Sequence, residues 1–321
     1  MNTEYVLRTE KLTKAFGHHR AVNAVSMNVR KGDIYGFIGK NGAGKTTFMK
    51  MVSGLMAPSG GSIELFGKKD EVTKPKRMNV DLFGKSIVEV QRKRIGCLIE
   101  APGLYPNMTA AENLEIARIE LGITEKAVTT EMLELVGLCD TGKKKVKNFS
   151  MGMKQRLGLA LSLMRNPDFL ILDEPINGLD PSGIKEMRDL LIRLNREKQM
   201  TILISSHILG ELSKLATRYG IIRDGSLIEE FDAIDLEERC RRCQKVMVED
   251  VGAATRILEE RLSIRNYDVP EQHVIRIFEQ IDEAARINEA LVLGGVALQE
   301  SYPAGQDLEG YFMDLMGDKN V

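Results

Sequence analysis

The sequence has no long apolar run, few cysteines and no excess of charge of either sign. It contains nothing close to the roughly 18 consecutive apolar residues of a membrane-spanning helix, and residues 1–14 lack the apolar stretch of a signal peptide. Four cysteines in 321 residues favour a reducing compartment over a disulfide-stabilised scaffold. The 45 basic and 46 acidic side chains nearly cancel, which excludes the charge excess typical of nucleic-acid binding. We therefore expect a cytoplasmic chain without a nucleic-acid partner.

The charge is unevenly distributed along the chain. Residues 1–226 carry 35 basic and 25 acidic side chains, whereas residues 227–321 carry 10 and 21. At about 150 residues per domain the length predicts two domains, and the change of sign places their boundary near residue 230. Whether the acidic second domain, 231–321, docks on the basic first one or both are simply solvated stays open. Residues 68–94 are polar and basic and are expected to be a solvated surface segment.

Residues 1–230 alternate short apolar runs with helical patterns, which is typical of an α/β fold with crossover helices. Buried strands are predicted at residues 34–38, 169–172 and 201–204. A helix follows the first strand, with a core face predicted at Phe48, Met51, Val52 and Leu55. Asp180, followed by Pro181, is expected to cap the start of another helix. Asp224 and Gly225 lie between two apolar pairs and predict a hairpin turn.

Residues 39–46 read GKNGAGKT and fit the pattern G-x-x-x-x-G-K-[ST]. The glycines allow backbone N–H groups to point at phosphate oxygens, and the dipole of the following helix adds positive potential. Lys45 is expected to reach the β- and γ-phosphates, and the Thr46 hydroxyl to ligate Mg²⁺. A buried strand before the segment and an amphipathic helix after it argue against a chance Gly-rich turn. The expected nucleotide contacts are Gly39, Asn41, Gly42, Ala43, Gly44, Lys45, Thr46 and Thr47.

Asp173 and Glu174 directly follow the apolar strand at 169–172. A carboxylate at the end of a buried strand beside a phosphate loop holds Mg²⁺. Glu174 is placed to polarise a water molecule for in-line attack on the γ-phosphate. The alternative, an acidic strand end that caps a helix, does not explain two adjacent carboxylates. The sequence thus predicts an ATP site with Mg²⁺ held by Asp173 and Thr46.

Three further segments follow in order: FSMGMKQR at 149–156, NGLD at 177–180 and SSH at 205–207. Each is weak alone, since an isolated histidine after a strand is more often structural than catalytic. Together with the two motifs above, they resemble the nucleotide-binding subunit of ATP-binding-cassette (ABC) transporters over residues 5–230. The resemblance implies an α/β P-loop fold with a mixed sheet core, an antiparallel β edge and a helical subdomain at about 100–165.

The resemblance also implies roles for single residues. Phe16 stands where the family has an aromatic side chain that stacks on adenine, the alternative being a core phenylalanine. Ser150 and Gly152 match the signature motif, which contacts the γ-phosphate of the partner's ATP across a head-to-tail dimer. Asp180 matches the loop that crosses the dimer interface, and His207 the switch histidine at the γ-phosphate. The implied catalytic residues are Lys45, Glu174 and His207, with ATP and Mg²⁺ as cofactors.

The chain departs from the family pattern at two places. Met151 and Met153 replace the usual Gly and Gln of the signature, but its phosphate-facing residues are retained. Glu100 stands where most members carry the Gln that links ATP to the membrane partner. We expect Glu100 either to ligate Mg²⁺ or to pair with a basic residue of the membrane subunit. This Glu, the form of the signature and the segment DLEGYF at 307–312 resemble the branch that exports bacitracin and lantibiotics.

The function implied is an ATPase subunit that powers export of a peptide antibiotic or a similar amphipathic compound and confers resistance or immunity. A homodimer, or a heterodimer with a similar ATPase, is expected in the ATP-bound state, held at the cytoplasmic face of the membrane by a separate permease. The alternatives are an exporter of a drug, lipid or ion, and a soluble ABC ATPase. The soluble classes usually carry two cassettes or long heptad repeats, and one motif set without heptads is present. Glu174 argues against a non-catalytic scaffold.

The tail, residues 231–321, has the order β-α-β-β-α-β followed by a last helix, which predicts a small α+β accessory domain of ferredoxin-like topology. Its strands are expected near residues 246–248, 264–269, 273–278 and 296–301. Cys240 and Cys243 are expected to be exposed thiols on a helix. A zinc site is the alternative, but it needs four ligands and only His273 lies nearby in sequence.

Overall fold

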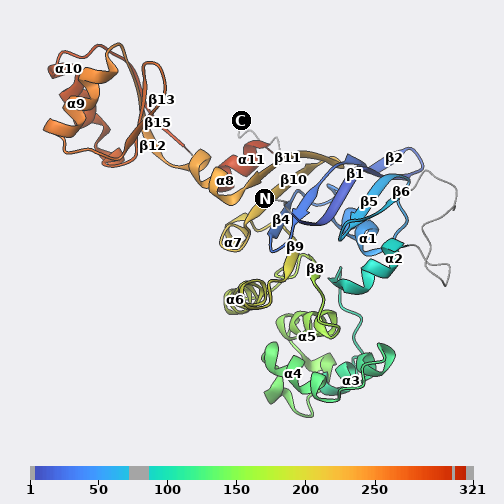
Figure 1. Ribbon diagram of the computed structural model, residues 1–321. Helices are drawn as coiled ribbons and strands as arrows, with labels where there is room; N and C mark the ends of the chain where they lie inside the picture. Colours follow the sequence, from blue (N-terminus) through green and yellow to red (C-terminus); the bar gives the residue numbers. More distant parts are fainter. Residues whose placement is uncertain (1–3, 72–86, 306–307, 316–321) are drawn as a thin grey trace. The chain divides into compact units, whose positions relative to one another are not determined.

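The structure is a computed structural model that describes residues 4–71, 87–305 and 308–315. It divides the chain into two compact units, Met1–Ala233 and Ile234–Val321 (Figure 1). The boundary predicted at residue 230 falls three residues before this division. Among the described residues, no helix combines the length and apolarity that crossing a membrane requires.

The central sheet of the first unit has the strand order β11-β10-β4-β9-β8-β7. Neighbouring strands from β10 to β7 are parallel, and β11 is antiparallel to β10. The strands β4, β8 and β9 are buried along their whole length, as expected for apolar strands covered on both faces. The bounds are β4 Ile34–Ile38, β7 Ile95–Leu98, β8 Phe169–Asp173, β9 Thr201–Ser206, β10 Arg218–Arg223 and β11 Ser226–Asp232.

A second, antiparallel sheet of the same unit has the order β2-β1-β5-β6, with β3 paired to β1. Its strands are β1 Tyr5–Phe16, β2 His19–Val25, β3 Asn28–Arg30, β5 Gly60–Leu65 and β6 Lys68–Glu71. Together the two sheets confirm the predicted mixed core with an antiparallel β edge. The basic segment 68–94 is described only at its two ends, because residues 72–86 lie outside the described part of the chain.

The helix after the first core strand, α1 (Lys45–Ser53), packs into the hydrophobic core that the two sheets share. Phe48, Met51 and Val52 are fully buried there, as predicted. The prediction was wrong for Leu55, which is 69% exposed. Gly54 ends the helix in the left-handed conformation, so Leu55 lies beyond the last turn and leaves the core face.

The remaining helices of the first unit include three in the range of the expected helical subdomain. Thr109 begins the first of them with a reciprocal capping box to Glu112, which satisfies two free backbone N–H groups. The bounds are α2 Ile87–Gln91, α3 Ala110–Glu120, α4 Ala127–Leu135, α5 Met151–Leu163, α6 Pro181–Lys198 and α7 Leu209–Leu212, with 3₁₀ turns at Arg92–Arg94, Cys139–Thr141 and Val146–Asn148.

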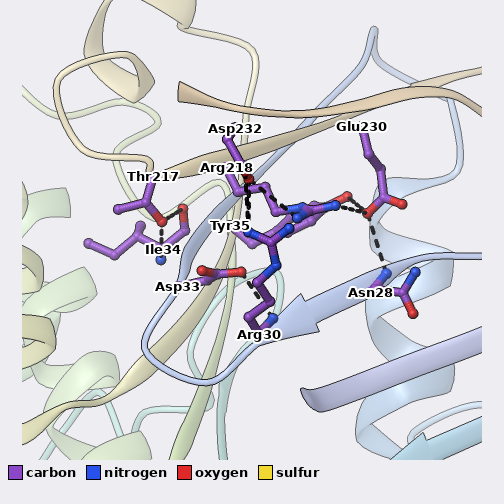
Figure 2. Close-up of polar contacts among 9 residues, drawn as sticks. All are labelled: Asn28, Arg30, Asp33, Ile34, Tyr35, Thr217, Arg218, Glu230 and Asp232. Atoms are coloured by element: carbon purple, nitrogen blue, oxygen red, sulfur yellow. Dashed lines mark hydrogen bonds and ion pairs between the residues drawn. The ribbon is translucent and has the colours of Figure 1, made fainter. Parts of the chain in front are cut away.

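A polar network lies at the edge of the central sheet where β4 begins (Figure 2). The Tyr35 hydroxyl donates to Glu230 Oε1 at 2.7 Å. Asp232 Oδ2 lies 3.2 Å from Arg30 Nη1, and its Oδ1 lies 3.3 Å from Arg218 Nη1. Tyr35 is fully buried, and this burial, followed by the charge of Glu230, raises the pKa of Tyr35 well above its usual value. The network therefore ties the beginnings of β4 and β10 to β3 and the end of β11.

The sheet of the second unit has the order β13-β14-β12-β15, and every pair is antiparallel. With α9 between β12 and β13, and α10 between β14 and β15, this order is the ferredoxin-like topology that the sequence predicted. The helices α9 and α10 cover one face of the sheet (Figure 1). The bounds are α8 Ala233–Cys240, β12 Cys243–Val248, α9 Val251–Arg261, β13 Tyr267–Glu271, β14 Val274–Ile277, α10 Ala284–Leu293, β15 Leu298–Ala304 and α11 Leu308–Leu315, with a 3₁₀ turn at Ile281–Glu283.

The prediction of two exposed thiols on one helix was wrong. Cys240 is the last residue of α8 and is 8% exposed, whereas Cys243 begins β12 and is 4% exposed. Burial raises the pKa of the Cys243 thiol, so it is a small apolar core residue rather than a nucleophile. In the described part of the chain, no group of three or more His, Cys, Asp or Glu side chains is arranged to hold a metal, and Nδ1 of His273 lies 3.1 Å from the Val248 carbonyl oxygen.

Candidate functional site

The phosphate loop runs from the buried end of β4 into the first turn of α1. Gly44 precedes the helix in the left-handed region with φ of 105°. A Cβ atom there would overlap the carbonyl oxygen of Ala21, and one on Gly39 would overlap that of Ile222. Only glycine fits these positions, so the loop keeps its curl and leaves the N–H groups of the first helical turn available to an anion.

Lys45 is held inside this loop. Its side chain is 6% exposed, and its Nζ donates to the carbonyl oxygens of Gly39 at 2.5 Å and Lys40 at 3.2 Å. Nζ also lies 3.5 Å from Glu174 Oε1. A buried ammonium group needs hydrogen-bond acceptors such as these carbonyl oxygens. Phosphate oxygens that enter the loop would replace them as acceptors, and because they are negatively charged they would bind the ammonium group more strongly.

The hairpin turn predicted at Asp224 and Gly225 is confirmed, and it is hydrogen-bonded to the phosphate loop. Both residues have positive φ, 49° and 77°, as a two-residue hairpin turn requires. The N–H of Gly225 donates to the Ala43 carbonyl oxygen at 3.1 Å, and its carbonyl oxygen accepts from the N–H of Asn23 at 2.7 Å. This turn therefore connects the phosphate loop to β2.

Asp173 lies at the end of β8 and is 6% exposed. Its Oδ2 accepts from the Thr46 hydroxyl at 2.6 Å, and its Oδ1 accepts from the Ser205 hydroxyl at 2.6 Å. The structure thus brings together the two residues predicted to hold Mg²⁺. It adds Ser205 of the neighbouring strand β9, a residue of the SSH segment for which the sequence analysis predicted no role.

The carboxylate of Glu174 contacts both Lys45 of the phosphate loop and His207 after β9. Its Oε2 lies 2.6 Å from His207 Nδ1, and its Oε1 is the atom beside the Lys45 ammonium. That Oε1 atom is buried and makes no hydrogen bond in the described part of the chain. The backbone of Glu174 is in the left-handed region with φ of 50°, where a non-glycine residue is strained. Glu174 therefore lies between the phosphate-loop lysine and the imidazole of His207.

The oxygen donors at Thr46 and Asp173 fit a magnesium ion. Mg²⁺ is usually bound through one or two carboxylates together with substrate phosphates, and the hydroxyl and the carboxylate lie within hydrogen-bonding distance of each other. No cluster of three or more His, Cys, Asp or Glu side chains suited to a metal occurs in residues 4–71, 87–305 and 308–315.

Glu100 forms an ion pair with a side chain of its own chain. Its Oε1 lies 2.6 Å from Lys50 Nζ, and its side chain is 62% exposed. Lys50 lies one turn after Thr46 on α1, so this ion pair joins the segment after β7 to the helix of the phosphate loop. No sequence motif predicts this pairing, because Lys50 has the pattern of an ordinary helix surface residue.

The residues assigned by family resemblance lie at separate places. Phe16 ends β1 and is 49% exposed, which excludes the core alternative; the Lys14 ammonium lies 5.2 Å from its ring centre. Ser150 caps α5 by accepting from the Met153 N–H at 3.3 Å. Gly152 lies in the first turn of that helix. Asp180 is the N-cap residue of α6 and Pro181 lies in its first turn, as predicted, although the Asp180 side chain makes no capping hydrogen bond.

Comparison with known proteins supports one family for the whole chain. The family model described as ABC transporter matches residues 22–177. The chain is 42% identical over 316 residues to the bacitracin transport ATP-binding protein BcrA of Bacillus licheniformis, covering 98% of this chain and 99% of that protein. It is 42% identical over 236 residues to the lantibiotic transport ATP-binding protein SrtF of Streptococcus pyogenes, covering 73% of this chain and 95% of that protein.

Solved structures with the same fold are ATP-binding cassettes. A nucleotide-free cassette from an ABC transporter superposes with a TM-score of 0.62 at 25% identity, covering 72% of this chain and 94% of that chain. The ADP conformation of the cassette MJ1267 superposes with a TM-score of 0.61 at 26% identity, covering 72% and 92%.

Proposed function

Because the chain belongs to the family of ABC transporter ATP-binding proteins, we propose that its ATP hydrolysis powers export of a peptide antibiotic through separate membrane subunits. The observation that carries the choice of cargo is the 42% identity to BcrA over nearly the full length of each protein. The chain binds nucleotide and is an ATPase, as its family is. Bacitracin or a similar amphipathic peptide is the proposed cargo, and resistance or immunity the proposed outcome.

The reaction proposed for the site begins with ATP on the phosphate loop. The triphosphate accepts hydrogen bonds from the N–H groups of residues 39–47, and Lys45 exchanges the Gly39 carbonyl for the β- and γ-phosphate oxygens. Magnesium, held by Thr46 and Asp173, would neutralise charge on the phosphates. Phe16, exposed at the end of β1, stacks on the adenine ring.

The chemical step proposed is in-line attack of water on the γ-phosphorus. Glu174 takes a proton from the attacking water, the new P–O bond forms, and the bond to the β-phosphate oxygen breaks to give ADP and phosphate. His207, 2.6 Å from Glu174, orients the carboxylate and contacts the γ-phosphate. The position of Glu174 beside both Lys45 and His207 supports this assignment.

The proposed active unit is a head-to-tail dimer, either of two copies or with a similar ATPase. Ser150 and Gly152 at the start of α5 would clamp the γ-phosphate of ATP bound to the partner, because a helix N-terminus favours an anion. Asp180 would cross the same interface. The permease would hold the dimer at the cytoplasmic face of the membrane, and the second unit, 231–321, would act as an accessory domain.

The cargo is tested in cells that carry the chain and its permease. Deleting the gene should lower the bacitracin or lantibiotic concentration that the cells tolerate severalfold. The wild-type chain should restore tolerance, whereas Lys45→Ala should not. Unchanged tolerance together with co-purification of an integral membrane protein would favour export of a drug, lipid or ion. Unchanged tolerance without such a protein would favour a soluble ABC ATPase.

A further inference from the structure

We propose that Ser205 is a positioning residue of the ATPase site, which fixes both catalytic carboxyl-bearing residues through one hydroxyl group. The proposal rests on the roles given above to Asp173 and Glu174 in hydrolysis. It does not depend on which cargo the transporter exports. Ser205 touches neither nucleotide nor water in the proposed reaction and acts only through these two neighbours.

The hydroxyl of Ser205 uses its proton and a lone pair at the same time. It donates to Asp173 Oδ1 at 2.6 Å and accepts from the backbone N–H of Glu174 at 2.9 Å. Ser205 is fully buried on β9, and it is the direct partner of Asp173 in the register between β8 and β9. In the intact protein no solvent reaches this hydroxyl, so both hydrogen bonds are made by Ser205 itself.

The first consequence concerns the carboxylate of Asp173. With Oδ1 occupied by Ser205, Oδ2 is the oxygen directed at Thr46, where the cation is proposed to bind. Loss of the hydroxyl would leave a buried Oδ1 without a donor and free the carboxylate to rotate about its last bond. Outer partners that orient a metal ligand in this way typically change metal affinity or activity by about 10- to 100-fold when they are removed.

The second consequence concerns the backbone of Glu174. Its left-handed conformation, φ of 50°, is strained and persists only where neighbouring groups hold it. The hydrogen bond from its N–H to Ser205 is one such restraint. It also fixes the direction in which the side chain leaves the backbone, toward His207 and Lys45.

The neighbouring hydroxyl of Ser206 shows that burial on this strand does not require such contacts. Ser206 is equally buried, yet its oxygen accepts from the N–H of Ile208 at 2.9 Å and caps the turn after the strand. At the other end of β9, the buried Thr201 hydroxyl accepts from the Gly32 N–H at 3.0 Å. Of the three, Ser205 is the hydroxyl that the structure joins to both acidic residues.

The test compares Ser205→Ala with Ser205→Thr and with Thr201→Val, a control that removes a buried hydroxyl from the same strand far from the site. The first measurement is the affinity of the purified chain for ADP with and without Mg²⁺, which requires no turnover. The factor by which Mg²⁺ strengthens ADP binding should fall about 10-fold or more in Ser205→Ala. It should be largely restored in Ser205→Thr and unchanged in Thr201→Val. The second measurement is kcat, which should follow the same order while the KM for ATP changes less.

Two results would overturn the proposal. One is an unchanged Mg²⁺ effect and an unchanged kcat in a folded Ser205→Ala protein. The other is an equal loss in Thr201→Val, because the effect would then be general to buried hydroxyls of the strand. Melting temperatures of the three variants identify loss of fold. Failure of peptide export in cells would contradict the proposed cargo alone, since these measurements use purified protein.

Discussion

Strand β4 has charged side chains near each of its ends, and the two sets differ in what their cations contact. At its beginning, Arg30 and Arg218 pair with the carboxylates of Asp232 and Glu230, as Figure 2 shows. At its other end, Lys45 Nζ donates to two backbone carbonyl oxygens and lies farther, at 3.5 Å, from the Glu174 carboxylate. Carbonyl groups are weaker partners than carboxylates, so that cation remains available to a stronger anion.

The comparison follows a rule of parallel sheets. Ligands bind outside the carboxyl ends of the strands, where β4, β8 and β9 deliver Lys45, Asp173 and His207. The opposite edge has no such task, and its charges connect neighbouring strands. The role of a charged cluster in this sheet therefore depends on the end of the strands at which it lies, and not on which charged residues it contains. Variants at the two edges should separate catalysis from stability.

The largest effect is expected for Glu174→Gln. The amide keeps the shape of the side chain but cannot accept a proton, so kcat should fall by about 10²- to 10⁴-fold. ATP affinity and melting temperature should stay close to wild type, and ATP should trap a stable dimer detectable by size exclusion. ATPase activity near the wild-type level would contradict the assignment of Glu174 as the base.

Arg218→Ala should give the opposite pattern. Removing this mostly buried guanidinium leaves Glu230 and Asp232 without one of their cations, which should lower the free energy of unfolding by about 3 kcal/mol. Denaturant unfolding measures the loss, and ATP affinity of the folded protein should remain unchanged. Exposed Arg165 provides the matched control, since Arg165→Ala should change stability little. A large loss of ATP affinity in folded Arg218→Ala would break the separation of the two edges.

Tyr35→Phe should change how stability depends on alkaline pH. The pKa of buried Tyr35 is raised, so above pH of about 10 the unfolded chain loses this proton and the folded chain keeps it. The free energy of unfolding then falls by about 1.4 kcal/mol per pH unit from this group. Tyr35→Phe should lose that part of the slope. Tyr105→Phe, at a position 47% exposed, should keep it, and equal slopes in the two variants would contradict the prediction.

The smallest effect on hydrolysis is expected for Glu100→Gln. The change weakens the ion pair with Lys50 but leaves the phosphate loop intact, so basal ATPase activity should stay within severalfold of wild type. Resistance in cells should be impaired if the pair transmits nucleotide binding to the permease. Lys50→Met should then impair resistance in the same way. Full resistance with normal hydrolysis would show that the charge has no coupling role.

Local sequence was sufficient for most of the nucleotide site. The phosphate loop and the Asp173-Glu174 pair are contiguous motifs, and their positions follow from the strands that precede them. Ser205 and Lys50 could not be assigned, because their partners lie 32 and 50 residues away and ordinary serine and lysine carry no pattern. The contacts that orient the site are thus the part that requires the structure.

In the second unit too, the order of the elements followed from the sequence pattern, whereas their exact bounds and the burial of single residues did not. Its β-α-β-β-α-β order was predictable, but the strand expected at 264–269 is Tyr267–Glu271. Ile264 is fully buried beneath the helices and belongs to the core before the strand begins. Cys240 and Cys243 were misjudged for a related reason, since the spacing C-x-x-C does not reveal that a helix ends and a strand begins between them.

The hydrogen bonds of Gly225 reduce the conformational entropy that the phosphate loop loses when a ligand binds. The turn binds Ala43 on one side and Asn23 on the other, so the loop is held in its curled form by groups that never meet the nucleotide. A binding loop that is already ordered surrenders little conformational entropy when its ligand arrives, and more of the contact energy appears as affinity. Part of the affinity for ATP would in this way come from the turn between β10 and β11, through its hydrogen bond to Ala43.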